Sequence, residues 1–384
     1  MTTLHLVGLP HTQLTRDASV CAFTQKAVKF VRMMQARGWR VVSYWGDEDQ
    51  AGADEHVSLF TRREQESWYG TFDANRLPGI ATFDARGRDW QTFNGRAYTE
   101  IMKRVEPRDI ILSLAGYAHQ PLTSQFPGVL IAEWAAGYQG WCEKYVCFES
   151  HAWRHHQYGT RGIHDGRWYD AVIPNFFDPE EWTLPVSGGG DHLAFVGRMI
   201  QRKGPQIAAD VAKEAGLPIV FAGSGVLESS PTRIVCGDGF VIEGERMEYL
   251  GTVGGLERNR VMRDARCVFA TTTYIEPFGA VAVEAQLCGT PAITTDWGAF
   301  PETVIDGVTG YRMKTLIDGV YAVEAALTLD PGEIRRSALE RYSLDAVGPA
   351  YDAWFRRLLD LWEDGWYTGV GEQTAPASAT IQEA

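Results

Sequence analysis

The sequence has no apolar run of the roughly 18 residues that a membrane-spanning helix needs. It opens with Met-Thr-Thr-Leu-His-Leu-Val-Gly, which lacks the basic region and the following apolar region of a secretory leader. Its six cysteines include no Cys-x-x-Cys pair, and Cys267 and Cys288 stand in apolar stretches typical of buried thiols. We therefore expect a cytoplasmic protein without a transmembrane segment.

The sequence also lacks an excess of positive charge. The formal net charge is −13 at pH 7, and the chain has no arginine-rich arm or lysine run. This balance argues against non-specific polyanion binding, although a basic cleft can coexist with an acidic exterior. The turn after the first expected strand lacks the Gly-x-Gly-x-x-Gly pattern of dinucleotide-binding domains. That absence argues against a dehydrogenase.

Alternating strand and helix patterns make up most of what is present. Apolar residues over 4–9, helical spacing over 18–37 and an apolar stretch over 39–44 predict a strand–helix–strand unit. Such a unit implies a parallel sheet with a right-handed crossover. The same patterns predict further elements, namely strands at 109–114 and 128–133 and a helix over about 140–158.

The pattern restarts after the Gly-rich stretch 184–190, which is the best linker in the chain. Strands are expected at 192–196 and 217–222 with a helix over 204–215 between them, so a second α/β domain follows. A length of 384 residues also suits two domains. We predict an α/β fold with the divisions 1–180 for the first domain, 190–349 for the second, and 369–384 for a disordered tail.

Residues 271–295 carry the strongest indication of a binding site. They are typical of a strand end, a loop, a helix and a second strand. Pro277 suits the first helical position because its missing N–H is unbonded there anyway, and Gly289 suits the helix end. Gly279 and Ala280 leave the N–H groups of the first turn open, and a helix N-terminus with free N–H groups can bind an anion.

Charged side chains surround this expected anion site. Glu276 precedes the helix and Glu284 lies inside it, so hydroxyl groups on either side of the anion could donate to them. A phosphate flanked by two polyols describes a nucleotide-sugar. Arg198 and Lys203 follow the first strand of the second domain, where two cations suit the two phosphates of a diphosphate. Alone, this pair would be ordinary solvated loop charge; with the helix N-terminus it predicts a phosphate clamp.

The second domain resembles the nucleotide-sugar half of the GT4-type retaining glycosyltransferases, a family with the GT-B fold. The resemblance is dense from about 172 to 312, with the motifs in the family's order. The matching segments are Ile173-Pro-Asn175, Val196-Gly-Arg-(x4)-Lys-Gly204, Phe221-Ala-Gly-Ser-Gly225, Glu276-(x7)-Glu284, Glu284-Ala-(x3)-Gly289-Thr-Pro291, Gly298-Ala-Phe-Pro301-Glu302 and Asp306-Gly-(x2)-Gly310.

The resemblance implies two Rossmann-like domains facing across a cleft, with a C-terminal helix over about 350–368 that crosses back to the first domain. It also implies that Arg198 and Lys203 hold the donor diphosphate, that Glu276 faces the sugar, and that Glu284 accepts hydrogen bonds from the ribose hydroxyls. The implied donor-binding residues are Gly197, Gly223, Phe278, Gly279, Ala280 and Glu284. Fixed positive charge at the leaving diphosphate would replace the Mg²⁺ used elsewhere, so no cofactor is required.

The first domain matches the family less well. Many members place a histidine just after the strand that corresponds to 129–133, whereas this chain has Glu133 followed by Trp134. Either Glu133 substitutes for that histidine, or His119 reaches the site from the neighbouring loop. An ordinary salt bridge is the alternative for Glu133.

Other residues of the first domain are candidates for lining the cleft. His11, Thr12 and Gln13 follow the first strand, and ligands in open α/β sheets bind at the carboxyl ends of strands; a hydrogen-bonded turn is the alternative. Trp134 and Tyr138 could stack on an acceptor ring, with packing at the domain interface as the alternative.

A metal site is not predicted. His151 and His155 would share a helical face, and His156 follows them, but no carboxylate or cysteine partner stands at ligand spacing. These histidines are expected to cap, pack or line the cleft.

Together these patterns predict a metal-independent retaining glycosyltransferase that transfers a hexose-type sugar from a nucleotide-diphosphate sugar, with a UDP-sugar favoured. The acceptor is an unspecified hydroxyl on a glycan, a small molecule or a modified DNA base. One alternative is a phage- or virus-type enzyme that glycosylates a hydroxymethylated base in DNA. An alternative of another class is a nucleotide-sugar-binding protein without catalysis. The oligomeric state is left open.

Overall fold

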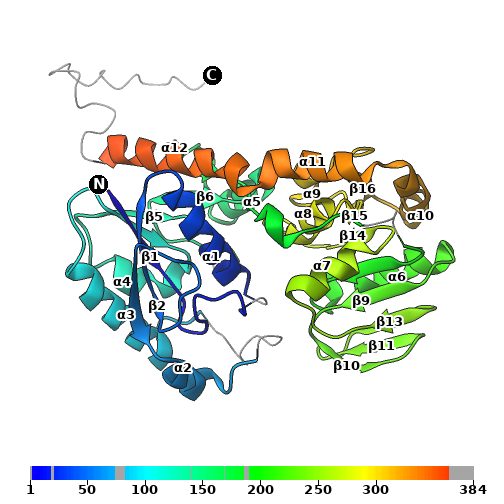
Figure 1. Ribbon diagram of the computed structural model, residues 1–384, viewed down its shortest axis with the longest axis horizontal. Helices are drawn as coiled ribbons and strands as arrows, with labels where there is room; N and C mark the ends of the chain where they lie inside the picture. Colours follow the sequence, from blue (N-terminus) through cyan, green and yellow to red (C-terminus); the bar gives the residue numbers. More distant parts are fainter. Residues whose placement is uncertain are drawn as a thin grey trace.

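A computed structural model describes residues 2–18, 21–73, 83–138, 140–167, 169–185 and 190–362. The described chain forms two parallel sheets, each flanked by helices, which lie next to one another in Figure 1. The expected tail over 369–384 and residues 186–189 of the expected linker lie outside the described residues. Within the described ranges, no helix combines the length and the apolarity needed to cross a membrane.

The first sheet contains seven parallel strands in the order β3-β2-β1-β4-β5-β6-β7. The strands are β1 (Thr3–Val7), β2 (Arg40–Gly46), β3 (Glu55–Phe60), β4 (Ile110–Ser113), β5 (Leu130–Glu133), β6 (Tyr145–Phe148) and β7 (Ala171–Val172). The helices are α1 (Ala22–Gln35), α2 (Arg62–Tyr69), α3 (Arg88–Met102), α4 (Gln120–Thr123) and α5 (His151–Thr160), with a 3-10 turn at Gly116–Ala118. Helices cover the sheet, so strands such as β1 are buried along their whole length.

The second sheet contains six parallel strands in the order β13-β9-β8-β14-β15-β16. These are β8 (Leu193–Val196), β9 (Ile219–Ala222), β13 (Met247–Tyr249), β14 (Val268–Ala270), β15 (Ala292–Thr295) and β16 (Gly310–Met313). The helices are α6 (Pro205–Glu214), α7 (Gly255–Arg263), α8 (Ala280–Leu287), α9 (Phe300–Thr303), α10 (Leu316–Ala325) and α11 (Pro331–Tyr342), with 3-10 turns at Pro179–Glu181, Gln201–Lys203 and Ala326–Thr328.

A small antiparallel sheet stands where a crossover helix would be usual. Strands β10 (Val226–Ser229), β11 (Arg233–Cys236) and β12 (Val241–Glu243) occupy the connection from β9 to β13. The side chains of Ile234 and Ile242 are buried and join the core of the second domain. The sequence patterns described above did not predict this sheet.

Both parallel sheets reverse their strand order once. In the first sheet the chain winds outward from β1 on one side and from β4 on the other, and in the second sheet from β8 and from β14. Open α/β sheets bind ligands at the carboxyl ends of the two strands at such a reversal. The loops after β8 and β14 are therefore the first places to look for a site.

The last helix, α12 (Leu344–Trp362), continues from α11 and lies along the first domain (Figure 1). The Tyr351 hydroxyl donates to the carbonyl oxygen of Trp134 at 3.2 Å, and the indole N–H of Trp39 donates to Asp352 at 2.7 Å. The chain thus passes from the second domain back onto the helices and strands of the first.

The predicted helix over about 140–158 is wrong in its first half. Residues Tyr145–Phe148 form strand β6, which pairs with β5 and β7 and is buried along its length. The helix that follows, α5, begins only at His151, after Ser150 accepts a hydrogen bond from the backbone N–H of Trp153. A run of four buried residues with an aromatic at each end fits either a strand or a helix. Pairing with the neighbouring strands determines which of the two forms.

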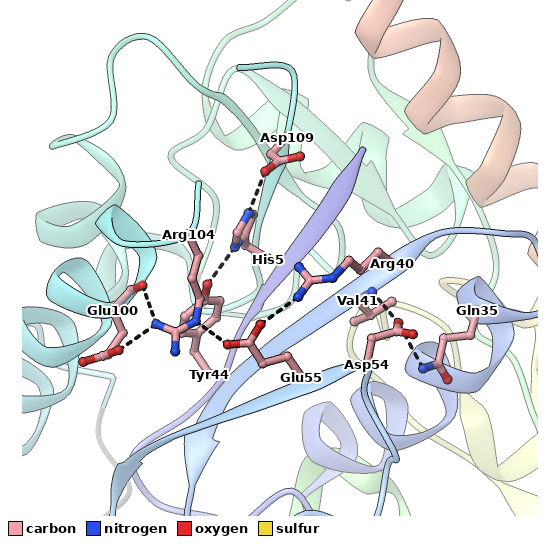
Figure 2. A network of polar contacts seen from close by, with 10 residues as sticks. All are labelled: His5, Gln35, Arg40, Val41, Tyr44, Asp54, Glu55, Glu100, Arg104 and Asp109. Atoms are coloured by element: carbon pink, nitrogen blue, oxygen red, sulfur yellow. Dashed lines mark hydrogen bonds and ion pairs between the residues drawn. The ribbon is translucent and has the colours of Figure 1, made fainter. Parts of the chain in front are cut away.

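A polar network ties the strands of the first sheet together at their amino ends, away from the loops that follow β1 and β4 (Figure 2). The buried ring of His5 lies 2.8 Å from the Tyr44 hydroxyl and 3.1 Å from Asp109. Burial raises the pKa of the Asp109 carboxyl. Hydrogen bonds from His5 and from backbone N–H groups outweigh this effect and hold the pKa below its usual range. Glu55, at the start of β3, binds Arg40 at the start of β2 and Arg104 just after α3. We regard this network as structural.

Candidate active site

The candidate site lies at the strand reversal of the second sheet. The loops after β8 and β14 meet there, and a small pocket opens between them and the start of α8. Its lining residues are Phe195, Val196, Lys203, Phe269, Ala270, Thr272, Glu276, Gly279 and Val281. Only two of these nine residues carry ionisable side chains, Lys203 and Glu276, and the two come from different loops.

Lys203 and Glu276 form an ion pair across the pocket. The side chains are 16% and 14% exposed, so water screens this pair less than a surface pair. Thr272 donates to the second oxygen of Glu276 at 2.8 Å, and Lys203 also lies over the ring of Tyr274 at 5.3 Å from its centre. The cation and the carboxylate therefore occupy fixed positions at the pocket.

Gly204 brings the two loops close enough for this contact. Its φ is +71°, and a Cβ there would lie 2.0 Å from the carbonyl oxygen of Thr271. The Thr271 hydroxyl donates to the Gly204 carbonyl at 2.7 Å. A side chain at 204 would push the loop after β8 away from the loop after β14 and separate Lys203 from Glu276.

Arg198 is exposed in the same loop, and its guanidinium makes no hydrogen bond or ion pair within the part of the chain that the structure describes. A second cation is thus available in the loop that carries Lys203. Gly197 and Gly223, which the resemblance implies are donor-binding, pack against each other: a Cβ on Gly223 would lie 1.7 Å from the Gly197 carbonyl oxygen. Their close contact allows the loops after β8 and β9 to lie side by side.

Helix α8 begins at Ala280, with Gly279 as its N-cap in the left-handed conformation (φ 78°) and without a side-chain cap. The prediction that Pro277 occupies the first helical position is therefore wrong, because the turn at Gly279 delays the helix by three residues. The side chain of Phe278 is buried against Phe177 and Tyr342. Only its backbone can serve a ligand. At the start of α8 the N–H of Ala282 donates to the Gly279 carbonyl at 3.0 Å, which leaves the preceding N–H groups without a partner inside the helix.

Glu284 lies in the second turn of α8 and contacts Arg258 of α7. The Nε of Arg258 donates to Oε2 of Glu284 at 2.9 Å, and Nη2 donates to the same oxygen. The resemblance implies a ribose-binding role for Glu284, and the sequence patterns did not single out Arg258. Only knowledge of how α7 packs on α8 could have identified this partner.

The turn after β1 is buried and internally bonded. Gln13 donates to Gln65 at 2.7 Å, Thr12 lies 2.7 Å from the Thr24 hydroxyl, and the carbonyl oxygen of His11 accepts from Gln65 at 2.8 Å. Burial lowers the pKa of His11 to about 4, opposed by the nearby Asp89 carboxylate. These contacts correspond to the hydrogen-bonded turn that the sequence left open as the alternative.

His119 lies in the core of the first domain rather than at an open surface. Its Nε2 donates to the Gly8 carbonyl at 2.9 Å, and its Nδ1 lies 3.1 Å from the Ser113 hydroxyl. Burial lowers its pKa to about 4, against the raising effect of the bond to Gly8. His119 joins the loops after β1 and β4, and it does not reach the pocket of the second domain in this conformation.

Glu133 is also fully buried, at the carboxyl end of β5. Its Oε2 accepts from the backbone N–H of Cys142 at 3.0 Å, while Oε1 has no hydrogen-bond partner. Burial raises the pKa of Glu133 to about 8, despite the Cys142 hydrogen bond and with a contribution from the Glu143 carboxylate. Burial thus favours the neutral form of this side chain. The salt-bridge alternative does not describe it, because Oε1 is unpartnered and Oε2 binds backbone.

The two aromatic candidates, Trp134 and Tyr138, differ in their exposure. Trp134 is fully buried and packs on Phe30 at 4.2 Å between ring centres, so the prediction that it lines the cleft is wrong. Tyr138 is 48% exposed, and its hydroxyl lies 2.9 Å from the hydroxyl of Tyr274, beside Lys203 and in the other domain. Tyr138 thus extends from the first domain to the candidate site.

The histidines of α5 contact the second domain through the helix backbone. The N–H groups of His151 and Ala152 donate to the Glu302 carboxylate at 2.9 and 2.8 Å. Arg154 lies between the rings of His151 and His155. In the described chain, no group of three or more His, Cys, Asp or Glu side chains is arranged to hold a metal ion. The Glu302 contact was not predicted, because Glu302 stood out only as part of a motif.

Comparison with known proteins identifies the second domain. Residues 180–318 match the family model described as glycosyl transferases group 1. The second domain is therefore similar to this family over the matched residues. A D-inositol 3-phosphate glycosyltransferase of Mycobacterium sp. (strain KMS) is 36% identical over 187 residues, which are 46% of this chain and 42% of that protein. The counterpart from Mycolicibacterium smegmatis is 30% identical over 205 residues, 49% of this chain and 46% of that protein. The chain thus spans less than half the length of these relatives.

Comparison with solved structures shows the fold across both domains. The glycosyltransferase AviGT4, involved in avilamycin A biosynthesis, has a TM-score of 0.61 at 18% identity and covers 94% of this chain and 98% of its own. Sucrose-phosphate synthase from Thermosynechococcus elongatus has a TM-score of 0.66 at 17% identity, covering 93% and 99%. The Anabaena protein HepE, solved with UDP-glucose, has a TM-score of 0.61 at 13% identity, covering 93% and 100%. The predicted GT-B fold is confirmed.

Proposed function

We propose that this chain is a retaining, metal-independent glycosyltransferase that moves a hexose-type sugar from a nucleotide-diphosphate sugar to a hydroxyl acceptor. The observation that carries the proposal is the meeting of Lys203 and Glu276 at the strand reversal of the second sheet, next to the N-terminus of α8. A cation, a carboxylate and free backbone N–H groups in one pocket suit a phosphate joined to a sugar.

Stabilisation of the leaving diphosphate supplies the chemistry. Negative charge grows on the β-phosphate as the bond from the sugar C1 to the phosphate oxygen breaks. Lys203 and the start of α8 lie at the pocket and can stabilise that charge, and Arg198 comes from the loop that carries Lys203. In the unliganded pocket Glu276 holds Lys203, so the diphosphate must take over this cation. Glu276 is then free to accept hydrogen bonds from the sugar hydroxyls.

The placement of the candidate bases favours retention. An inverting reaction needs a base on the acceptor side, opposite the leaving group. Glu133 and His119, the two candidates that the sequence suggested, are both fully buried in the described structure. With neither accessible, the proton of the acceptor hydroxyl passes to the leaving phosphate oxygen. The new C1–O bond then forms on the face from which the diphosphate departs.

A UDP-sugar is the favoured donor in this proposal, supported by the fold shared with HepE, which was solved with UDP-glucose. The acceptor stays open, because the family match lies at 180–318 whereas the acceptor side is built by the first domain. A hydroxyl on a glycan, on a small molecule such as an inositol phosphate, or on a modified DNA base are the candidates. From that side Tyr138 reaches Tyr274, next to Lys203 of the donor pocket.

Screening purified protein against UDP-, GDP- and ADP-sugars by thermal shift, followed by mass spectrometry of acceptor mixtures, tests the proposal. The mixtures include hydroxymethylated DNA and inositol phosphates, so the DNA-modifying alternative is one of the outcomes. Transfer with an unchanged anomeric configuration, read by NMR of the product, is expected. Binding of a donor without transfer or hydrolysis under any condition would instead indicate a nucleotide-sugar-binding protein, and binding of none would reject the proposal.

A further inference from the structure

Arg258 lies outside the pocket and contacts Glu284. Arg258 lies on the second turn of α7, and both of its donating nitrogens bind the same carboxylate oxygen, Oε2. No hydrogen bond to Oε1 of Glu284 is recorded within the described chain. One oxygen is thus held by the protein, and the other has its full capacity to accept hydrogen bonds.

The surroundings make Arg258 a rigid support. The next residue, Asn259, is buried; it accepts from the Thr183 hydroxyl at 2.9 Å and donates to the Glu181 carbonyl at 3.3 Å. Its amide also lies 3.6 Å from the sulfur of Cys288, at the end of α8. Helix α7 is therefore fastened both to α8 and to the segment that enters the second domain, so the guanidinium stays in place beside Glu284.

We propose that Arg258 is a positioning residue for the nucleotide: it fixes Glu284 so that Oε1 accepts hydrogen bonds from the ribose hydroxyls of the donor. This inference rests on the proposed function, because it assumes a ribonucleotide in the pocket. Without Arg258 the Glu284 side chain, 13% exposed, would have no cation to offset its partly buried charge, and it would rotate toward water. The ribose would lose a preorganised acceptor, while the diphosphate clamp would be untouched.

The alternative role is a plain structural ion pair between two helices. A partly exposed pair contributes little to stability, so the thermal midpoint alone does not separate the two roles. Nucleotides with and without the ribose hydroxyls do distinguish the two roles. If Arg258 acts through Glu284 on the ribose, its replacement weakens binding of UDP but leaves binding of 2′,3′-dideoxy-UDP unchanged.

The test measures the Kd of UDP and of 2′,3′-dideoxy-UDP by calorimetry for the wild type, Arg258→Met, Arg258→Lys and Glu284→Gln. Arg260→Met is the matched control, since Arg260 is exposed on the same helix and its side chain makes no recorded contact in the described chain. We expect about a tenfold weaker Kd for UDP in Arg258→Met, a smaller loss in Arg258→Lys, and no change in the control. The dideoxy nucleotide should bind all five proteins alike.

Equal UDP affinity of Arg258→Met and the wild type would overturn the inference, as would an equal loss for UDP and the dideoxy form. Failure of the wild type to bind any nucleoside diphosphate would instead reject the proposed function. A variant that does not fold is recognised by its thermal midpoint. In that case the test uses Arg258→Lys, which keeps the charge. The inference then stands or falls on whether this variant weakens the Kd of UDP more than the Kd of 2′,3′-dideoxy-UDP.

Discussion

The carboxylate of Glu302 in the second domain accepts a hydrogen bond of 2.9 Å from the backbone N–H of His151 in the first. His151 is the first residue of α5, which has no acidic side chain of its own in its first turn. The anion that a helix N-terminus favours is thus supplied by the other domain. The backbone carbonyl of Glu302 is held in turn by Arg341 and by Tyr342, at the end of α11. This contact fixes how the two halves of the site face one another.

Replacing Glu302 should therefore loosen the arrangement of the domains without harming the donor pocket. We expect Glu302→Ala to lower kcat/KM by about tenfold or more, because small misplacement of reacting groups is costly, while the Kd for UDP stays unchanged. Small-angle scattering should show a broader distribution of domain separations. Glu333→Ala, which removes an exposed acid of α11, is the control. Unchanged scattering and unchanged turnover in Glu302→Ala would contradict the role of this contact.

The clamp itself gives the largest expected effect. Lys203→Ala or Arg198→Ala should lower the rate of sugar transfer by about a hundredfold or more, on the order of the loss of one fixed electrostatic donor. Initial rates at saturating donor check this, with the thermal midpoint as the control for folding. Near-normal turnover in both variants would reject the clamp.

Much of this clamp could be predicted from the sequence, because its parts are local. The loop with Arg198 and Lys203 follows the apolar strand β8, and the carboxylates Glu276 and Glu284 frame α8, so strand and helix patterns alone indicate which strand end and which helix carry them. The switch of strand order in the second sheet then places both loops at the same edge.

The errors arise where tertiary packing decides. Trp134 directly follows β5, and His119 lies in the loop after β4. Site residues and core residues look alike in sequence at such positions, and both side chains are buried. The left-handed turn at Gly279 moves the start of α8 beyond Pro277. Arg258 could not be linked to Glu284, because the two are 26 positions apart and meet only when α7 packs on α8.

The buried Glu133 should make stability depend on pH. Its pKa rises from 4.5 to about 8 on folding, so the neutral form is favoured in the folded protein. The contribution of this group is complete below the pKa of the unfolded chain and is lost as the pH rises through about 8. We expect the unfolding free energy of Glu133→Gln to exceed that of the wild type by a margin that grows by about 1 kcal/mol per pH unit across that window.

Urea titrations at several pH values check this margin. A constant difference between Glu133→Gln and the wild type from acid to alkaline pH would show that folding does not raise the pKa of Glu133. Glu143→Gln serves as a comparison. The Glu143 carboxylate raises the pKa of Glu133, so removing its charge should let the loss of stability end at a lower pH.

Metal removal should leave transfer intact. In the proposed mechanism, Arg198, Lys203 and the N-terminus of α8 would supply the positive charge that Mg²⁺ supplies to a diphosphate in other enzymes. We expect equal initial rates before and after dialysis against EDTA. Complete loss of activity that Mn²⁺ restores would contradict the metal-independent mechanism.

The central claim is that a nucleotide-sugar occupies the pocket between Lys203 and α8. A crystal structure of the protein with a bound UDP-sugar measures this most directly. We expect the β-phosphate within hydrogen-bond distance of Lys203 and of the N–H groups of Gly279 and Ala280, with the ion pair between Lys203 and Glu276 opened and Glu276 facing the sugar. A nucleotide bound elsewhere, with that ion pair intact, would contradict the account.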